Sequence, residues 1–286
     1  MIWPNKTMKN KIDLLVIFLI ILFTNQIAYS KPNIVVTIAP IASLVAMLTK
    51  DKADVVILDK SGGCPHHHSA KPSDKSLVDK AEMIIYIDDN FDSLISSMIL
   101  NYKGRKVKIS DFSSINFRGI NDGINWHFWL DLENVKVLHS YLAEVIIQTF
   151  PEIANEVRQN LDEAIARIDD LDKNKRSELA ELAPVALLSD SLEHFFKSIN
   201  NTQLKVLQIS NTSLKNMQKL DDVLSSDSIK CIVLDIDQSS QGYSKYNKII
   251  VQLDSENWVL ADQINLSGDL FIDQYSKMIE QLKLCK

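Results

Sequence analysis

Three consecutive histidines, His66, His67 and His68, lie in residues 62–74, which read GGCPHHHSAKPSD. The whole chain has six histidines, so half of them fall in this one segment. Imidazole nitrogens bind divalent transition metals, which favours a metal-binding loop. A solvated basic loop and a piece of catalytic apparatus are the alternatives. Cys64 and His66 are too close in sequence for an obvious nucleophile–base pair, and no third orienting group accompanies them, which disfavours catalysis.

Other side chains that can bind metal follow short apolar runs elsewhere in the chain. His127 lies in NWHFWLD, Ser189 and Asp190 follow VALL with His194 one turn later, and Asp254 ends KIIVQLD. Zinc takes about four nitrogen, oxygen or sulfur ligands in a tetrahedral shell. Segments so far apart in sequence can supply one shell only if the fold brings them together.

Short β-branched runs alternate with helical patterns along the chain. We expect strands at 33–37, 53–58, 83–87, 107–109, 185–189, 204–209, 231–235 and 248–254, and helices at 40–49, from 73, around 90–100, after 131, from 190, near 214–225 and from about 269. This alternation predicts an α/β fold with parallel sheets covered by helices on both faces. In such sheets the ligand site lies beyond the carboxyl ends of the strands, where the candidate side chains are found.

Residues 150–183 form one long amphipathic pattern. Apolar residues recur there at steps of mostly three or four, and no glycine or proline interrupts from 152 to 183. The pattern predicts a helix of about thirty residues, about 45 Å long. We therefore expect two α/β lobes, at 31–149 and 184–286, joined by a rigid helix at 150–183.

The first thirty residues have the pattern of a secretory signal peptide. Lys9 and Lys11 precede a short apolar run, and Ala28-Tyr29-Ser30 supplies small residues for a cleavage site. The apolar run is shorter than the roughly twenty residues that span a bilayer. An uncleaved N-terminal anchor is the alternative, and Met8 could equally be the true start.

The charge of the chain argues against a nucleic-acid partner. Residues 1–30 carry a net charge of +2, so the mature chain has −8 against −6 for the full sequence. Phosphates attract clustered lysine and arginine side chains, and no basic stripe occurs in this sequence.

The chain has three cysteines, Cys64, Cys231 and Cys285. In an oxidising compartment a pair of them can form a disulfide. Cys231 opens an apolar strand-like run and Cys285 ends the terminal helix, which favours a disulfide between these two and leaves Cys64 beside the histidines. Three free thiols are the alternative.

Two sequence blocks carry a resemblance to a known family. His66 lies six residues before Pro72-Ser73-Asp74, and His127 opens the block His127-Phe128-Trp129-Leu130-Asp131. Further matches are Pro151-Glu152 with Asn160, Cys231, and Leu253-Asp254. Over residues 33–284 the chain resembles the zinc- and manganese-binding periplasmic components of ATP-driven uptake systems. The resemblance implies metal ligands at His66, His127 and Asp254. His67 and His68 then form a solvent-facing flank with auxiliary contacts to the metal.

One position departs from the family pattern. The third ligand of the family, histidine in zinc binders or glutamate in manganese binders, falls at Ser189, and the tyrosine expected five residues later is His194. On a helical projection Asp190 and His194 lie about 40° apart on the polar face, opposite the apolar face of Leu192, Phe195, Phe196 and Ile199. We expect Asp190 or His194 to replace the missing ligand, or water to fill its place. The alternatives are that Asp190 caps the helix within a capping box and that His194 is a solvated surface residue.

Structural roles compete with binding at the other candidates too. His127, which lies among aromatic residues, could be a packed histidine satisfied by backbone. Asp254 could be a turn residue. His139 flanks an apolar helical stripe and is assigned a structural role, and Asp235 and Asp237 are assigned supporting or turn roles.

The resemblance implies a periplasmic solute-binding protein, monomeric and not an enzyme. It would capture zinc, with manganese as the other metal, and deliver it to an inner-membrane permease and its ATPase. Two or three histidines with one carboxylate suit zinc, whereas carboxylate-rich shells suit manganese. Ligands must lose protons to bind, so affinity should fall as the pH drops through about 6.

Two other functions compete with metal transport. One is an interaction module without tight metal binding, motivated by Ser189. The other is a zinc hydrolase that keeps a water on the metal and uses Asp190 as a base. The sequence has no HExxH helix, phosphate-binding loop or nucleophile elbow, which disfavours the hydrolase.

Overall fold

The structure is a computed structural model that describes residues 30–58, 71–93, 96–119, 123–197, 199, 214–258 and 268–286. The predicted signal peptide up to residue 29, the segment with Cys64 and His66–His68, and the predicted strand at 204–209 lie outside these residues. Across the described ranges, no helix has the length and apolar character needed to cross a membrane.

The N-terminal sheet has four parallel strands in the order β2-β1-β3-β4. Its strands are β1 Asn33–Val36, β2 Asp54–Ile57, β3 Met83–Tyr86 and β4 Arg105–Lys108, and its helices are α2 Ala39–Thr49, α3 Pro72–Lys80 and α4 Ser96–Asn101. Val36 and Ile85 pack into the core that contains α2, whereas Val35 and Ile84 pack against Val78 of α3 and Ile99 of α4. The sheet is thus buried on both faces.

The C-terminal sheet has three parallel strands in the order β5-β6-β7. Its strands are β5 Val185–Leu187, β6 Cys231–Asp235 and β7 Ile249–Leu253, and the helices of this half are α7 Glu193–Lys197, α8 Leu214–Ser225 and α9 Leu270–Leu282. Val233 faces the large core, and its neighbours Ile232 and Leu234 pack with Leu224 of α8. Two parallel sheets flanked by helices confirm the predicted α/β fold.

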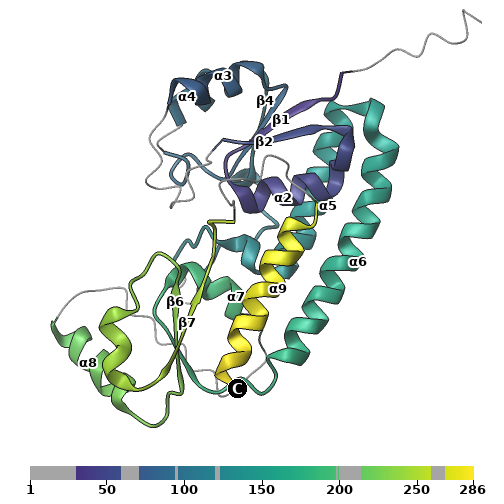
Figure 1. Ribbon diagram of the computed structural model, residues 1–286. Coiled ribbons are helices and arrows are strands. Elements are labelled where there is room, and N and C mark those ends of the chain that lie inside the picture. Colours follow the sequence, from purple (N-terminus) through teal and green to yellow (C-terminus); the bar gives the residue numbers. More distant parts are fainter. Residues whose placement is uncertain are drawn as a thin grey trace, which may run out of the picture. The chain divides into compact units, whose positions relative to one another are not determined.

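A long helix, α6 Ala154–Glu178, lies between the two sheets in the sequence and packs against α2, α9 and the preceding helix α5 Leu132–Thr149 (Figure 1). It has 25 residues, about 37 Å, so the prediction of about thirty residues was too long. Pro151 opens a separate 3-10 turn, η5 Pro151–Ile153, and the helix ends at Glu178, with Leu179 as its C-cap and Pro184 further along the chain. Residues Pro32–Lys286 group into one unit by their contacts, and the lobe boundaries at 149/150 and 183/184 stay predictions.

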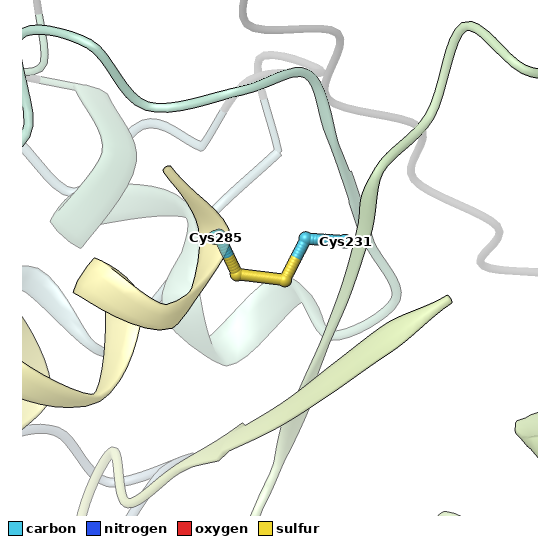
Figure 2. Close-up of a disulfide and its surroundings, with 2 residues drawn as sticks. All are labelled: Cys231 and Cys285. Atoms are coloured by element: carbon cyan, nitrogen blue, oxygen red, sulfur yellow. A yellow bond between two sulfur atoms is a disulfide. The ribbon is translucent and has the colours of Figure 1, made fainter. Parts of the chain in front are cut away.

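Cys231 and Cys285 form a disulfide that joins the first residue of β6 to the short turn after α9 (Figure 2). Both cysteines are buried. This is the pair that the sequence favoured. Short 3-10 turns complete the described elements, and they are η1 Lys50–Lys52, η3 Ile109–Asp111, η4 Phe128–Leu130, η6 Asp190–Leu192, η7 Gln241–Tyr246 and η8 Lys283–Cys285.

Candidate functional site

His127 is held at the start of a short turn that both halves of the chain fix in place. The three residues of η4, Phe128, Trp129 and Leu130, are fully buried. The indole Nε1 of Trp129 donates to the carbonyl of Ser255, 2.9 Å away, after β7. The hydroxyl of Tyr275 on α9 donates to the carbonyl of Leu130 at 2.7 Å. The apolar residues after His127 therefore dock its backbone onto the C-terminal half.

Each ring nitrogen of His127 faces a side-chain oxygen. Nδ1 lies 3.1 Å from Oδ1 of Asn125, and Nε2 lies 3.2 Å from Oε2 of Glu256. An amide oxygen only accepts hydrogen bonds, so this contact requires the proton on Nδ1 and leaves Nε2 directed at the carboxylate. The ring is not satisfied by backbone, as the packed-histidine alternative supposed. The His127 side chain is 14% exposed, so the ring is mostly buried but still reaches the surface.

The turn after β7 presents Glu256 to this ring. Oδ1 of Asp254 accepts from the backbone nitrogens of Glu256, at 3.2 Å, and Asn257, at 2.7 Å. The carbonyl of Asp254 accepts from the indole of Trp258 at 2.9 Å. Burial raises the pKa of Asp254. Asp254 thus fills the turn role, and its assignment as a metal ligand stays a prediction. Glu256, which faces His127, is a candidate site residue that the sequence reasoning missed.

A pocket of about 310 Å³ adjoins His127 and Glu256 and is lined by residues of both halves. Its polar lining residues are Asn125, His127, Ser189, Asp190, Ser191, Asp235, Asp237, Gln238, Ser255 and Glu256. Asp254 and His194 are not part of this lining. Within the described ranges, no three His, Cys, Asp or Glu side chains come close enough together to hold a metal ion. A complete coordination shell would therefore need at least one ligand from elsewhere or a movement of the pocket wall.

Ser189, where the family resemblance expects a ligand, is tied into a hydroxyl chain. Its Oγ lies 2.6 Å from Oγ of Ser191, which donates to Oδ2 of Asp235. The other oxygen of Asp235 accepts from the backbone nitrogen of Ile236 at 2.7 Å. Burial raises the pKa of Asp235 to about 6. The hydroxyl of Ser189 is thus directed toward Ser191, and Asp235 accepts from Ser191, while the supporting or turn role of Asp235 stays a prediction.

The residues that follow Ser189 differ from two expectations. Asp190 is exposed and is the first residue of η6, while Ser189 holds the cap position without a side-chain cap, so the capping-box interpretation was wrong. His194 is 1% exposed, so neither the polar helical face nor the solvated surface residue is correct. The side chains from Ser191 to Phe196 are all buried, so tertiary packing covers the polar face of this segment as well as its apolar face.

The two buried histidines of the described chain have backbone partners. His194 Nε2 lies 3.3 Å from the carbonyl of Asn125, and burial lowers the pKa of His194 to about 4. His139 is fully buried, its Nε2 lies 3.1 Å from the carbonyl of Leu44, and burial lowers its pKa to about 4 as well. Both rings are neutral near pH 7. His139 has the structural role that the sequence predicted, and the role of His194 as a substitute ligand stays a prediction.

Comparison with known proteins identifies the class that this fold and site define. The family described as "ZnuA: Zinc-uptake complex component A periplasmic" matches residues 34–282. The chain belongs to this family. Membership makes it a metal-binding substrate-binding component of an ABC-type uptake system, located outside the cytoplasm.

Two relatives show the range of names in the family. The uncharacterized protein RP014 of Rickettsia prowazekii (strain Madrid E) is 40% identical over 274 residues, covering 95% of this chain and 89% of that protein. The iron ABC transporter substrate-binding lipoprotein MtsA of Streptococcus pyogenes serotype M1 is 24% identical over 185 residues, covering 58% of this chain and 57% of that protein.

Solved structures share the fold. The periplasmic zinc-binding protein TroA of Treponema pallidum has a TM-score of 0.73 and 18% identity, over 90% of this chain and 99% of its own. The solute-binding protein FpvC of Pseudomonas aeruginosa, in complex with Mn²⁺, has a TM-score of 0.74 and 16% identity, over 90% of this chain and 98% of its own. At these identities the likeness concerns the fold.

Proposed function

We propose that the protein captures a divalent transition metal, with zinc as the preferred ion, in the pocket beside His127. It then delivers the ion to an inner-membrane permease that an ATPase drives. The observation that carries the proposal is the pair formed by Nε2 of His127 and Oε2 of Glu256, 3.2 Å apart and contributed by opposite halves of the chain. A neutral imidazole and a carboxylate are both ligands that zinc takes in proteins.

The spacing of this pair suits a shared cation. Two ligands about 2.0–2.1 Å from zinc at a tetrahedral angle lie about 3.3 Å apart. Nε2 and Oε2 already have nearly that separation. The other ring nitrogen of His127 is hydrogen-bonded to Asn125, the second contact that metal-ligating histidines usually make. Capture then needs little rearrangement of these two side chains.

The remaining ligands come from segments on either side of the pair. In this proposal His66 reaches the cation from the segment after β2, with His67 and His68 as auxiliary contacts. Asp254 or the pocket carboxylate Asp190 adds a further oxygen, and water takes the place that Ser189 leaves.

Zinc as the cargo rests on the family description and on the two kinds of donor in the pair. TroA is named for zinc, whereas MtsA is named for iron and FpvC was solved with Mn²⁺. Oxygen-rich shells suit manganese, and the pocket wall also carries Asp235 and Asp237. Competition among Zn²⁺, Mn²⁺ and Fe²⁺ for the metal-free protein therefore decides the cargo.

Calorimetric titration of the mature chain with Zn²⁺ tests the proposal. We expect stoichiometric tight binding, weakened by His127→Ala and by Glu256→Gln by more than the 10–100-fold that outer contacts typically contribute. Glu152→Gln, at an exposed glutamate on η5, is the matched control and should bind like the wild type. Unchanged affinity in both pocket variants would remove the pair from the metal site.

One observation favours a second function, an interaction module without tight metal binding. Ser189 turns its hydroxyl to Ser191 and offers no ligand of the family type. Wild-type protein that binds none of Zn²⁺, Mn²⁺ and Fe²⁺ in separate calorimetric titrations would leave this second function standing and end the transport proposal.

A further inference from the structure

Asn125 contacts His127 and the C-terminal half at the same time. Its Oδ1 accepts from the backbone nitrogen of His127 at 3.0 Å and faces Nδ1 of the ring at 3.1 Å. Its Nδ2 donates to the carbonyl of Asp190, at 2.7 Å, and to Oε2 of Glu193, at 3.2 Å. The residue is 8% exposed. One buried amide therefore contacts the ring of His127 through its oxygen and the segment after β5 through its nitrogen.

These partners fix the orientation of the amide. Its NH2 group needs acceptors, and the carbonyl of Asp190 and the carboxylate of Glu193 supply them. A flipped amide would turn that NH2 toward the backbone N–H of His127, so two donors would face each other. Oδ1 therefore has to point at His127, and it holds the proton on Nδ1 only while Asp190 and Glu193 hold the other end.

The backbone of Asn125 is fixed from both halves as well. Its nitrogen donates to the carbonyl of Phe117 at 2.7 Å, within the turn that also pairs Arg118 with Ile124. Its carbonyl faces Nε2 of the buried His194 at 3.3 Å. A carbonyl only accepts, so His194 donates here through Nε2. His194 thereby contacts Asn125, and it is not among the residues that line the pocket.

A glycine makes room for the contact between Asn125 and Glu193. A Cβ added at Gly119 would lie 2.2 Å from Oε2 of Glu193 and 3.3 Å from Cβ of Asn125. Glu193 is buried at 3% exposure, and its carboxylate occupies the space that a side chain at 119 would fill. The contact between the two halves depends on this absence of a side chain.

We propose that Asn125 is a positioning residue that makes the orientation of His127 depend on contact with the segment Asp190–His194. This segment, which follows Ser189, then serves the metal through Asn125 in addition to any oxygen ligand that Asp190 supplies. The metal-binding part of the inference rests on the proposed function, whereas the orientation of His127 can be measured without metal.

The test follows the Nδ1 proton of His127 and the affinity for Zn²⁺ in three variants. Asn125→Ala removes both ends of the amide. Asn125→Asp keeps an acceptor for His127 but loses the donor and sets a carboxylate against Glu193. Gly119→Ala displaces Glu193 and leaves Asn125 intact. Long-range proton–nitrogen NMR reports the protonated ring nitrogen and its exchange with water, in metal-free and Zn²⁺-loaded protein.

We expect slow exchange of the His127 Nδ1 proton in the wild type and fast exchange in Asn125→Ala, with a 10–100-fold loss of Zn²⁺ affinity. Asn125→Asp should keep the Nδ1 proton protected in part, and Gly119→Ala should lose affinity although residue 119 contacts no proposed ligand. The inference would be overturned if Asn125→Ala and Gly119→Ala both had the same Nδ1 proton exchange rate and the same Zn²⁺ affinity as the wild type.

Two outcomes separate this inference from the proposed function. Wild-type protein that binds no Zn²⁺ but has a protected Nδ1 proton, lost in Asn125→Ala, would end the transport function and keep the positioning role. If circular dichroism shows that Asn125→Ala does not fold, Gly119→Ala and Asn125→Asp carry the same test. Gly119→Ala requires mainly the end of the Glu193 side chain to move, and Asn125→Asp replaces the amide nitrogen by an oxygen without changing the shape of the side chain.

Discussion

Lys175 gives the most quantitative prediction, because this lysine on α6 is fully buried where α6 meets α7 and α9. Its Nζ donates to the carbonyl of Phe195 on α7 and to the hydroxyl of Tyr275 on α9, the latter at 2.9 Å. Tyr275 in turn holds the turn that carries His127 through Leu130. Burial lowers the pKa of Lys175 from 10.5 to about 7, against the opposing effect of nearby aspartates.

The perturbation is Lys175→Met, which keeps an unbranched side chain and removes the titrating group. The unfolded chain binds the lysine proton up to pH 10.5, whereas the folded chain binds it only up to about pH 7. Between these values the unfolded state holds more protons, so the stability of the wild type rises with pH at about 1.4 kcal/mol per unit. From pH 7 to pH 9 this amounts to about 2 kcal/mol, because the transition is only half complete at pH 7.

Urea unfolding of both proteins at pH 7, 8 and 9 measures this difference. We expect the free energy of unfolding of the wild type to rise by about 2 kcal/mol relative to Lys175→Met over that range. Lys173→Met, at an exposed lysine two residues earlier on the same helix, is the matched control and should run parallel to the wild type. Parallel profiles for the wild type and Lys175→Met would refute the argument that burial suppresses the charge of Lys175.

Two further predictions concern stability. The folded pKa of His139, about 4, lies below its unfolded value of 6.5, so stability present above pH 6.5 is lost as the pH falls. His139→Leu should therefore lose about 2.5 kcal/mol less than the wild type between pH 7.5 and 4.5, by urea unfolding, and equal losses would contradict this. The disulfide between Cys231 and Cys285 spans 54 residues, so the double Cys→Ala variant should lose about 4 kcal/mol by the same measurement. Unchanged stability would mean that the bond does not constrain the unfolded chain.

The strands and most helices could be predicted from the sequence because they depend on local patterns. The β-branched runs at 33–37 and 231–235 became β1 and β6, and the buried face of Leu192, Phe195, Phe196 and Ile199 was correct. Helix ends were less predictable. Leu179 was expected inside the long helix because its spacing is helical, but the chain leaves the helix at that residue, ahead of Pro184.

The site was harder to predict because its contacts join distant segments. The Oδ1 of Asn125 has a local partner in His127, but the acceptors of its Nδ2 lie 65 and 68 residues away, so the sequence did not indicate its link to the C-terminal half. The position of Glu256 could have been predicted from Asp254. An aspartate after a strand accepts hydrogen bonds from the backbone nitrogens two and three residues later, which forms a tight turn. That turn decides which carboxylate faces His127. His194 was misplaced because the helical projection assigned its polar face to solvent, whereas tertiary packing buries both faces of this segment.

The central claim is that a cation binds between the two halves of the chain, on His127 and Glu256. Anomalous X-ray diffraction at the zinc edge, on crystals of the mature protein loaded with one equivalent of Zn²⁺, tests it most directly. The account predicts one zinc peak about 2.0–2.2 Å from both Nε2 of His127 and an oxygen of Glu256. A zinc ion held elsewhere, with these two side chains still in direct contact, would contradict it.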